Sequence, residues 1–226
     1  MSFIYPLFVL AMTAAPAASV ADEVSEAAPI CANATGTDDQ GFYTFWHDTG
    51  TGCMTLGSGG AYSVTWDLGA QGNLVAGRGW ETGAEDRTIH YAARTFEPGA
   101  NGYLGLYGWS TDPLVEYYVV DSWGDFEPPG NAGEFLGAFE SDGGSYRVYR
   151  TQRINQPSIQ GTATFYQYWS VRTSKLTTGA RATITFQNHV DAWRRVGLEL
   201  GALNYQVLAT EGFGSVGRSD VAVTVR

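Results

Sequence analysis

Residues 113–124 read Pro-Leu-Val-Glu-Tyr-Tyr-Val-Val-Asp-Ser-Trp-Gly, a stretch of β-branched and aromatic residues that is typical of a β-strand. Side chains alternate between the two faces of a strand, so Glu116, Tyr118 and Val120 share one face. A strand core favours Val, Ile, Tyr and Phe, and a carboxylate on its aromatic face needs a reason. The stretch therefore predicts a strand that carries an unusual acidic group.

A second stretch, residues 205–214, has the same character and reads Tyr-Gln-Val-Leu-Ala-Thr-Glu-Gly-Phe-Gly. Alternation places Glu211 on one face with Tyr205, Val207 and Ala209. Two carboxylates that converge in an aromatic groove are what glycoside hydrolysis requires. The alternative is that Glu116 and Glu211 lie on edge strands and point to water, and the patterning does not decide between the two.

Short alternating runs continue along the chain from Gly41 onward. Turn signals separate them, for example Ser58-Gly59-Gly60, Asn101-Gly102 and Asp142-Gly143-Gly144. Strands at this spacing predict a sandwich of two sheets rather than βαβ units.

A single segment, Asn188–Leu200, breaks the period of two. Its apolar residues Val190, Trp193, Val196 and Leu200 recur at helical spacing, which predicts one helix packed on the sandwich. The expected fold class is therefore all-β with a single α-helix.

The composition agrees with this class and narrows the choice of partner. The chain has 226 residues, of which 29 are glycine, 14% are aromatic and only 16% are charged. Aromatic faces stack on the apolar faces of sugar rings, so the surplus of aromatics favours a carbohydrate. The formal net charge of −10, with Lys175 as the single lysine, argues against nucleic acid or an anionic membrane surface as a partner.

The N-terminal region has the pattern of an export signal. Residues 1–21 contain no charge, and an apolar run is followed by small residues that end in Ser19-Val20-Ala21. This pattern predicts a signal peptide over residues 1–21 and a secreted protein, although no Lys or Arg precedes the apolar run. Residues 22–40 lack periodicity and are expected to form a flexible segment before a domain at residues 41–226.

Cys31 and Cys53 are the two cysteines of the chain. In an exported protein an even number predicts a disulfide, which would tie the N-terminal segment to the start of the β domain. Two unpaired thiols are the alternative. The spacing lacks nearby histidine ligands and gives no sign of a metal site.

Ordered motifs over residues 42–225 identify a family. The chain resembles the family 11 endo-β-1,4-xylanases of the glycoside hydrolases over nearly all of its predicted mature length. The motifs that carry the resemblance are Gly60-Ala-Tyr-Ser-Val-Thr-Trp66, Gly77-Arg-Gly-Trp80, Gly102-Tyr-Leu-Gly-Leu-Tyr-Gly-Trp109, residues 113–124 as quoted above, Ser141-Asp-Gly-Gly144, Gln156-Pro-Ser-Ile159, Phe165-Tyr-Gln-Tyr-Trp-Ser-Val-Arg172, Ile184-Thr-Phe-Gln-Asn-His-Val-Asp-Ala-Trp193 and Ala209-Thr-Glu-Gly212.

The resemblance implies a β-jelly roll of two curved antiparallel sheets with one helix. It also implies a xylanase catalytic domain that hydrolyses internal β-1,4-xylosidic bonds of xylan and xylo-oligosaccharides with retention, without a metal or organic cofactor. Glu116 matches the family nucleophile and Glu211 the acid/base. A retaining enzyme holds these groups about 5–5.5 Å apart, and the charge of the first raises the pKa of the second. We expect a secreted monomer.

The resemblance further assigns a shell around the two glutamates. Asn73 falls where the family places the residue that hydrogen-bonds the acid/base, which predicts a pH optimum near neutral. Gln167 matches a residue that hydrogen-bonds near the nucleophile, and residues 157–159 match the tip of a thumb hairpin that closes over substrate. The expected substrate-binding residues are Trp46, Tyr107, Tyr118, Arg153, Pro157, Ser158, Ile159, Gln167, Trp169 and Tyr205.

Three positions depart from the family pattern: Arg78 replaces a commoner lysine, Phe213 replaces a commoner tyrosine, and residues 214–217 are atypical. They affect the expected details of subsites and pH tuning, not the reaction.

Two other functions stay open. A lectin-like carbohydrate-binding jelly roll would keep the aromatic groove but would not need both glutamates. A cellulase of the related jelly-roll family is disfavoured by the xylanase-type Pro-Ser-Ile thumb.

Overall fold

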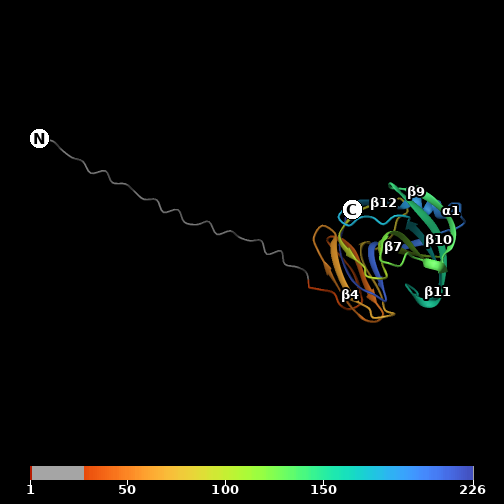
Figure 1. Ribbon diagram of the computed structural model, residues 1–226, viewed down its shortest axis with the longest axis horizontal. Coiled ribbons are helices and arrows are strands. Elements are labelled where there is room, and N and C mark those ends of the chain that lie inside the picture. Colours follow the sequence, from red (N-terminus) through yellow and green to blue (C-terminus); the bar gives the residue numbers. More distant parts are fainter. Residues whose placement is uncertain (2–27, 226) are drawn as a thin grey trace.

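The computed structural model describes residue 1 and residues 28–225 (Figure 1). Apart from Met1, the predicted signal peptide 1–21 lies outside the described residues, as do residues 22–27 of the predicted N-terminal segment.

The described chain is built mainly from strands, with one α-helix and one short 3-10 helix. The elements are β1 (Ala34–Asp38), β2 (Gly41–His47), β3 (Thr51–Leu56), β4 (Ala61–Asp67), β5 (Asn73–Trp80), β6 (Thr88–Glu97), β7 (Gly102–Thr111), β8 (Val115–Trp123), η1 (Gly130–Ala132), β9 (Glu134–Ser141), β10 (Gly144–Ser158), β11 (Gly161–Arg172), β12 (Arg181–Thr185), α1 (Phe186–Arg195), β13 (Ala202–Phe213) and β14 (Val216–Val223).

The strands form two sheets, which confirms the predicted jelly roll. The nine-stranded sheet has the order β1-β2-β5-β13-β7-β8-β11-β10-β9, and the five-stranded sheet has the order β12-β6-β14-β4-β3. In Figure 1, β4 marks the smaller sheet, and β7, β10 and β11 mark the larger one.

One strand pair departs from the expected antiparallel pattern. β8 and β11 are parallel, with Glu116 opposite Gln167, whereas the other pairs are antiparallel. Residues 124–133 carry the chain from the end of β8 to the start of β9, and the meander β9-β10-β11 then returns to β8. β9 and β11 run in the same direction, because each is antiparallel to β10. The connection starts β9 in the direction of β8, so β11 also runs parallel to β8.

The larger sheet is apolar on both faces. One face packs on the smaller sheet through a core that includes Phe45, Tyr62, Leu106 and Tyr117. The other face carries a second buried cluster, and every residue of β8 is buried as a result. The second cluster consists of Phe42, Val75, Tyr107, Trp109, Tyr118, Val120, Trp123, Phe165, Trp169, Val171, Val207 and Ala209.

Helix α1 covers one end of the core. Phe186 stacks on Tyr117 with ring centroids 5.0 Å apart, and Trp193 lies 6.1 Å from the same ring. The predicted span 188–200 is too long at its C-terminal end. Gly197 has φ 80, a left-handed conformation that glycine adopts readily at a helix end, and the helix stops at Arg195.

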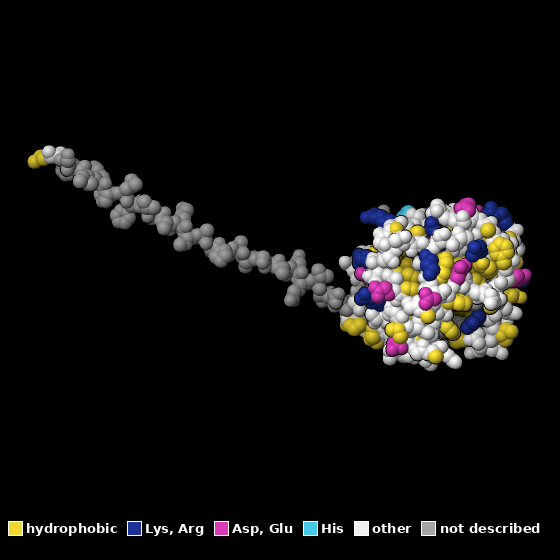
Figure 2. Space-filling model, in the orientation of Figure 1, with side chains coloured by type: hydrophobic (Ala, Val, Ile, Leu, Met, Phe, Trp, Pro, Cys, Tyr) yellow, Lys and Arg dark blue, Asp and Glu magenta, His cyan; other side chains and the backbone are white. Residues whose placement is uncertain are grey.

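Two further features concern the helices and the charged side chains at the surface. No helix within the described residues is both long and apolar enough to cross a membrane. On the face shown in Figure 2, Lys and Arg side chains are interspersed with Asp and Glu and do not form one basic patch.

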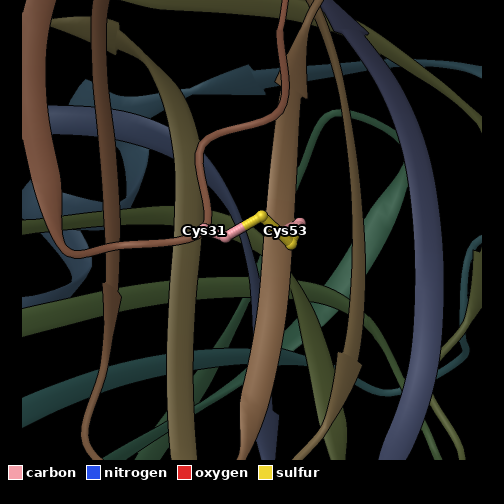
Figure 3. The surroundings of a disulfide bond; sticks show 2 residues. All are labelled: Cys31 and Cys53. Atoms are coloured by element: carbon pink, nitrogen blue, oxygen red, sulfur yellow. A yellow bond between two sulfur atoms is a disulfide. The ribbon is translucent and has the colours of Figure 1, made fainter.

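The N-terminal segment is more ordered than predicted. Ile30 exchanges two backbone hydrogen bonds with Met54, and Ala34–Asp38 form β1 on β2. A disulfide joins Cys31 to Cys53 on β3 (Figure 3), so the predicted pairing is confirmed and the alternative of two unpaired thiols is wrong. The prediction of a flexible segment through residue 40 is therefore wrong for residues 30–38. An edge strand pairs through main-chain hydrogen bonds and needs no apolar pattern, so the sequence did not indicate this strand.

Candidate active site

A cleft of about 810 Å³ lies over the second apolar face of the nine-stranded sheet. It is lined by strands from β1 to β13 and by the tip of the β10–β11 hairpin. All of the predicted catalytic, tuning and substrate-binding residues line this cleft: Trp46, Asn73, Tyr107, Glu116, Tyr118, Arg153, Pro157, Ser158, Ile159, Gln167, Trp169, Tyr205 and Glu211.

Glu116 lies on β8 with both carboxylate oxygens occupied. Tyr107 donates its hydroxyl to Oε1 at 2.6 Å, and Gln167 donates Nε2 to Oε2 at 2.6 Å. The side chain is only 8% exposed, and this burial raises its pKa, whereas the two donors lower it. Both donors stabilise the ionised form of Glu116.

The two donors are themselves held in place. Trp109 donates its indole N–H to the Tyr107 hydroxyl at 2.8 Å. Thr151 donates its hydroxyl to Gln167 Oε1 at 2.8 Å and accepts the indole N–H of Trp169 at 3.0 Å. Because Oε1 of Gln167 accepts the Thr151 hydroxyl, its amide nitrogen faces Glu116.

Glu211 lies on β13, on the other side of β7 from Glu116. Asn73 donates Nδ2 to Glu211 Oε1 at 2.9 Å and also to the backbone carbonyl of Gly212 at 3.1 Å. The other oxygen, Oε2, has no hydrogen-bond partner among the described residues. Glu211 therefore keeps one carboxyl oxygen unpaired at the wall of the cleft.

The two carboxyls have different electrostatic surroundings. Burial raises the pKa of Glu211 to about 8, and the charge of Glu116 contributes to the rise. Hydrogen bonds occupy both oxygens of Glu116 but only one of Glu211. The two hydrogen bonds therefore favour the ionised form of Glu116, whereas burial and the charge of Glu116 favour the protonated form of Glu211.

Asn73 is oriented through its backbone. The backbone N–H of Asn73 donates to Asp48 Oδ1 at 2.7 Å, and its backbone carbonyl accepts from the backbone N–H of Asp48 at 3.1 Å. This pair fixes the first residue of β5 beside the end of β13, where Asn73 is paired with Phe213.

Aromatic rings form the floor and walls of the cleft. Tyr118 stacks on Trp169 with centroids 3.9 Å apart and planes at 5°. Tyr107 lies 6.0 Å from Tyr205. Trp169 is almost fully buried beneath these rings, and Trp46 on β2 is partly exposed at the β1–β2 end of the cleft. Trp46 therefore presents an exposed indole face to the cleft, whereas Trp169 packs against Tyr118 in the floor of the cleft.

The β10–β11 hairpin places the predicted thumb residues over the cleft. Ser158 donates its hydroxyl to the Gly161 carbonyl at 2.6 Å and accepts the Gln160 N–H at 3.0 Å, which closes the tip. Pro157 and Ile159 line the cleft from this hairpin. Arg153 is exposed at its base, and its charge lowers the pKa of both Glu116 and Glu211.

Two of the positions that depart from the family pattern lie in different surroundings. Phe213 lines the cleft beside Asn73 and is 41% exposed. Arg78 is fully buried and pairs with Asp38 of β1, and its Nη1 also donates to the Gly57 carbonyl at 3.0 Å.

Sequence patterning missed two residues of the site, Thr151 and Asp48. Thr151 lies two residues before Arg153 on the same strand, so strand alternation could have placed it on the cleft face. Asp48 follows β2 in a loop, and no periodic signal marks it. Among the described residues, no group of three or more His, Cys, Asp or Glu is placed to hold a metal ion.

Comparisons with known proteins indicate the family of this chain. Residues 38–222 match the model of the family described as "Glycosyl hydrolases family 11". The chain is 46% identical over 211 residues to endo-1,4-beta-xylanase Xyn11B of Cellvibrio japonicus, covering 92% of this chain and 59% of that protein. It is 46% identical over 216 residues to endo-1,4-beta-xylanase 11A of Botryotinia fuckeliana, covering 93% and 92% respectively.

A third relative is longer. The chain is 49% identical over 198 residues to a bifunctional xylanase/xylan deacetylase of Cellvibrio japonicus, which covers 86% of this chain and 30% of that protein. The match to the two Cellvibrio japonicus proteins thus spans less than two thirds of their length.

Proposed function

Because this chain belongs to glycosyl hydrolases family 11, we propose that it is an endo-1,4-β-xylanase that cuts internal β-1,4-xylosidic bonds of xylan with retention of anomeric configuration. The observation that carries the proposal is one cleft with two carboxyls in unlike surroundings. Glu116 has two donors, and Glu211 has a raised pKa and one unpaired oxygen.

The proposed reaction has two displacements. In the first, the Glu116 carboxylate attacks the anomeric carbon, the glycosidic C–O bond breaks, and Glu211 gives its proton to the leaving oxygen. In the second, Glu211 takes a proton from water, the water oxygen attacks the anomeric carbon, and the bond to Glu116 breaks. The charge of Glu116 is absent in the intermediate, so the pKa of Glu211 falls and it can act as the base.

The surrounding residues have roles that follow from their contacts. Tyr107 and Gln167 stabilise the charge on Glu116, and Asn73 tunes the pKa of Glu211. Trp46 offers a stacking surface for a xylose ring, and Tyr118 and Tyr205 line the position of the reacting sugar. The thumb tip, residues 157–159, and Arg153 contact the xylan substrate from the hairpin side of the cleft.

We also propose that the protein is secreted after removal of residues 1–21 and acts as a monomer on xylan and xylo-oligosaccharides. The Cys31–Cys53 disulfide supports an oxidising compartment outside the cytosol.

The test is digestion of xylan by the purified protein, with the anomers of the new reducing ends followed by NMR. The β-anomer should appear first and then equilibrate with the α-anomer. Early α-anomer would overturn retention, whereas cleavage of a soluble cellulose but not of xylan would favour the cellulase alternative. Binding without cleavage would favour the lectin alternative. A Glu116→Ala variant is the control and should lose activity by about 10⁴-fold or more.

A further inference from the structure

The turn between β13 and β14 belongs to the third stretch that departs from the family pattern, residues 214–217. Gly214 and Ser215 form this turn, shortly after Glu211 on the same chain segment. Ser215 is only 6% exposed, although turn residues usually face solvent. Its hydroxyl makes hydrogen bonds inside the protein instead.

The hydroxyl of Ser215 links the two sheets. It accepts the indole N–H of Trp66 at 3.0 Å and donates to the backbone carbonyl of Asn101 at 2.8 Å. Trp66 lies on β4 of the smaller sheet, and Asn101 immediately precedes β7 of the larger one. The same Asn101 carbonyl accepts the backbone N–H of Phe213 at 3.0 Å. The end of β13 is thereby joined to both sheets.

The turn is also bonded to the residues that precede Asn73. The backbone N–H of Gly214 donates to the Gly72 carbonyl at 2.7 Å, and the Ser215 carbonyl accepts the Leu68 N–H at 3.0 Å. The N–H of Gly72 in turn donates to the Leu68 carbonyl at 3.1 Å. Because Asn73 is the next residue, the start of β5 and the end of β13 are attached to one junction.

Gly212 lies between this junction and the two side chains that it serves. Nδ2 of Asn73 donates to the Gly212 carbonyl at 3.1 Å and to Oε1 of Glu211 at 2.9 Å. From the core side, the indole of Trp66 lies so close that a β-carbon at residue 212 would come within 2.6 Å of Nε1. The indole, fixed by Ser215, therefore limits how far the end of β13 can move into the core.

We propose that Ser215 is a positioning residue, which holds Asn73 at hydrogen-bond distance from Glu211. It does so by joining the end of β13 to β4 and to the start of β5. The inference rests on the proposed xylanase function and adds a residue that bonds to neither carboxyl. The role requires a specific dependence, because Ser215 can affect the titration of Glu211 only while Asn73 donates its bond.

The test is the titration of Glu211, followed by NMR of its side-chain carboxyl carbon. The hydrogen bond from Asn73 lowers the pKa of Glu211, so loosening this bond raises that pKa. In Ser215→Ala the pKa should rise by about 0.3 to 1 pH unit, which corresponds to the net contribution of one hydrogen bond. The basic limb of kcat/KM on xylan should move to higher pH with it, because Glu211 must be protonated to act as the acid.

The other groups around Glu211 are kept in this variant. Titratable and charged side chains that interact with it come from several strands: Tyr103 and Tyr107 on β7, Glu116 and Tyr118 on β8, Arg153 on β10, and Tyr205 on β13. Ser215→Ala removes no charge and none of these side chains. The signal of Glu116 is recorded with that of Glu211, because the two carboxyls influence each other's titration.

Two comparisons make the test specific. Ser110→Ala is the matched control, since Ser110 is also a buried serine that donates to a backbone carbonyl, that of Pro113 at 3.0 Å, and it does not line the cleft. This control should leave the pKa of Glu211 near the wild-type value. In an Asn73→Ala background, Ser215→Ala should cause no further rise, because the bond that it loosens is already absent.

The outcomes separate the inference from the proposed function. A rise that persists unchanged in the Asn73→Ala background, or a titration in Ser215→Ala equal to that in Ser110→Ala, would overturn the positioning role. If the wild type does not cleave xylan, the proposed function fails, and the NMR titration still decides whether Ser215 positions the pair. Melting temperatures show whether Ser215→Ala is folded. If it is not, Trp66→Phe, which removes the indole N–H and keeps an aromatic ring, replaces it with the same expectations.

Discussion

The core between the sheets and the cleft each contain a buried carboxyl with a raised pKa, yet the two groups are built differently. Asp121 on β8 is fully buried, and its Oδ2 and Oδ1 accept the hydroxyls of Tyr91 and Tyr146 at 2.6 Å each. Burial raises its pKa to about 6. Both oxygens are satisfied, and Asp121 does not line the cleft.

Glu211 differs in the features that matter for chemistry. Its pKa of about 8 also results mainly from burial, but its Oε2 has no described partner and it lines the cleft beside Asn73. A raised pKa therefore does not by itself mark a catalytic acid, since structural carboxyls have one too. An unpaired oxygen at a cleft wall, opposite a second carboxyl, is the distinguishing feature.

The difference between the two carboxyls is tested most directly by removing each in turn and measuring turnover. Glu211→Gln should lower kcat/KM on xylan by about 10²- to 10⁴-fold, because the general acid is lost. The loss should shrink on an aryl xylobioside with a leaving group of low pKa, which departs without a proton. Asp121→Asn is the matched control and should keep kcat near the wild-type value below its melting temperature. Equal losses in the two variants would contradict the distinction.

Asp121 should instead control the pH dependence of stability. Its pKa is about 6 in the folded protein against an ordinary value of 3.8 for an aspartate, so the folded state binds the proton more tightly. The free energy of unfolding is unaffected below about pH 4 and falls as pH rises to about 6, by about 3 kcal/mol for this group. Asp121→Asn has no such titration.

The measurement is denaturant unfolding of both proteins at pH 4 and pH 7. Other carboxyls contribute equally to the two proteins, so the difference between their pH slopes isolates Asp121. The wild type should lose more stability than Asp121→Asn over this interval. Parallel losses would show that Asp121 does not titrate there.

The cleft could be predicted from the sequence more completely than the contacts that hold it. Glu116, Gln167 and Tyr107 lie in strands whose alternation and motifs give both the face and the neighbours. The parallel pairing of β8 with β11 could not be predicted, because the pattern of one strand does not specify its partner or direction. Asp121 was missed for a related reason, since Tyr91 and Tyr146 come from distant strands.

β1 shows a different limit. Its residues Ala34–Asp38 carry no apolar pattern, and Asp38 is held by Arg78, which lies in another motif. A strand that is fixed by a disulfide and an ion pair leaves little trace in hydrophobic periodicity. The departure of Arg78 from the family pattern was visible in the sequence, but its partner could be identified only in the structure.

The smallest expected effect concerns the tuning of Glu211 by its neighbour. Asn73 donates Nδ2 to Glu211 Oε1 at 2.9 Å and does not itself titrate. In Asn73→Asp, the residue must be protonated to donate the same bond, so the active form of the pair is populated at lower pH. The optimum of the pH–rate profile on xylan should therefore move in the acidic direction, with little change in melting temperature. Asn101→Asp, at another cleft-lining position, is the control for a general charge effect. An unshifted profile in Asn73→Asp, or an equal shift in the control, would show that the hydrogen bond from Asn73 does not set the pKa of Glu211.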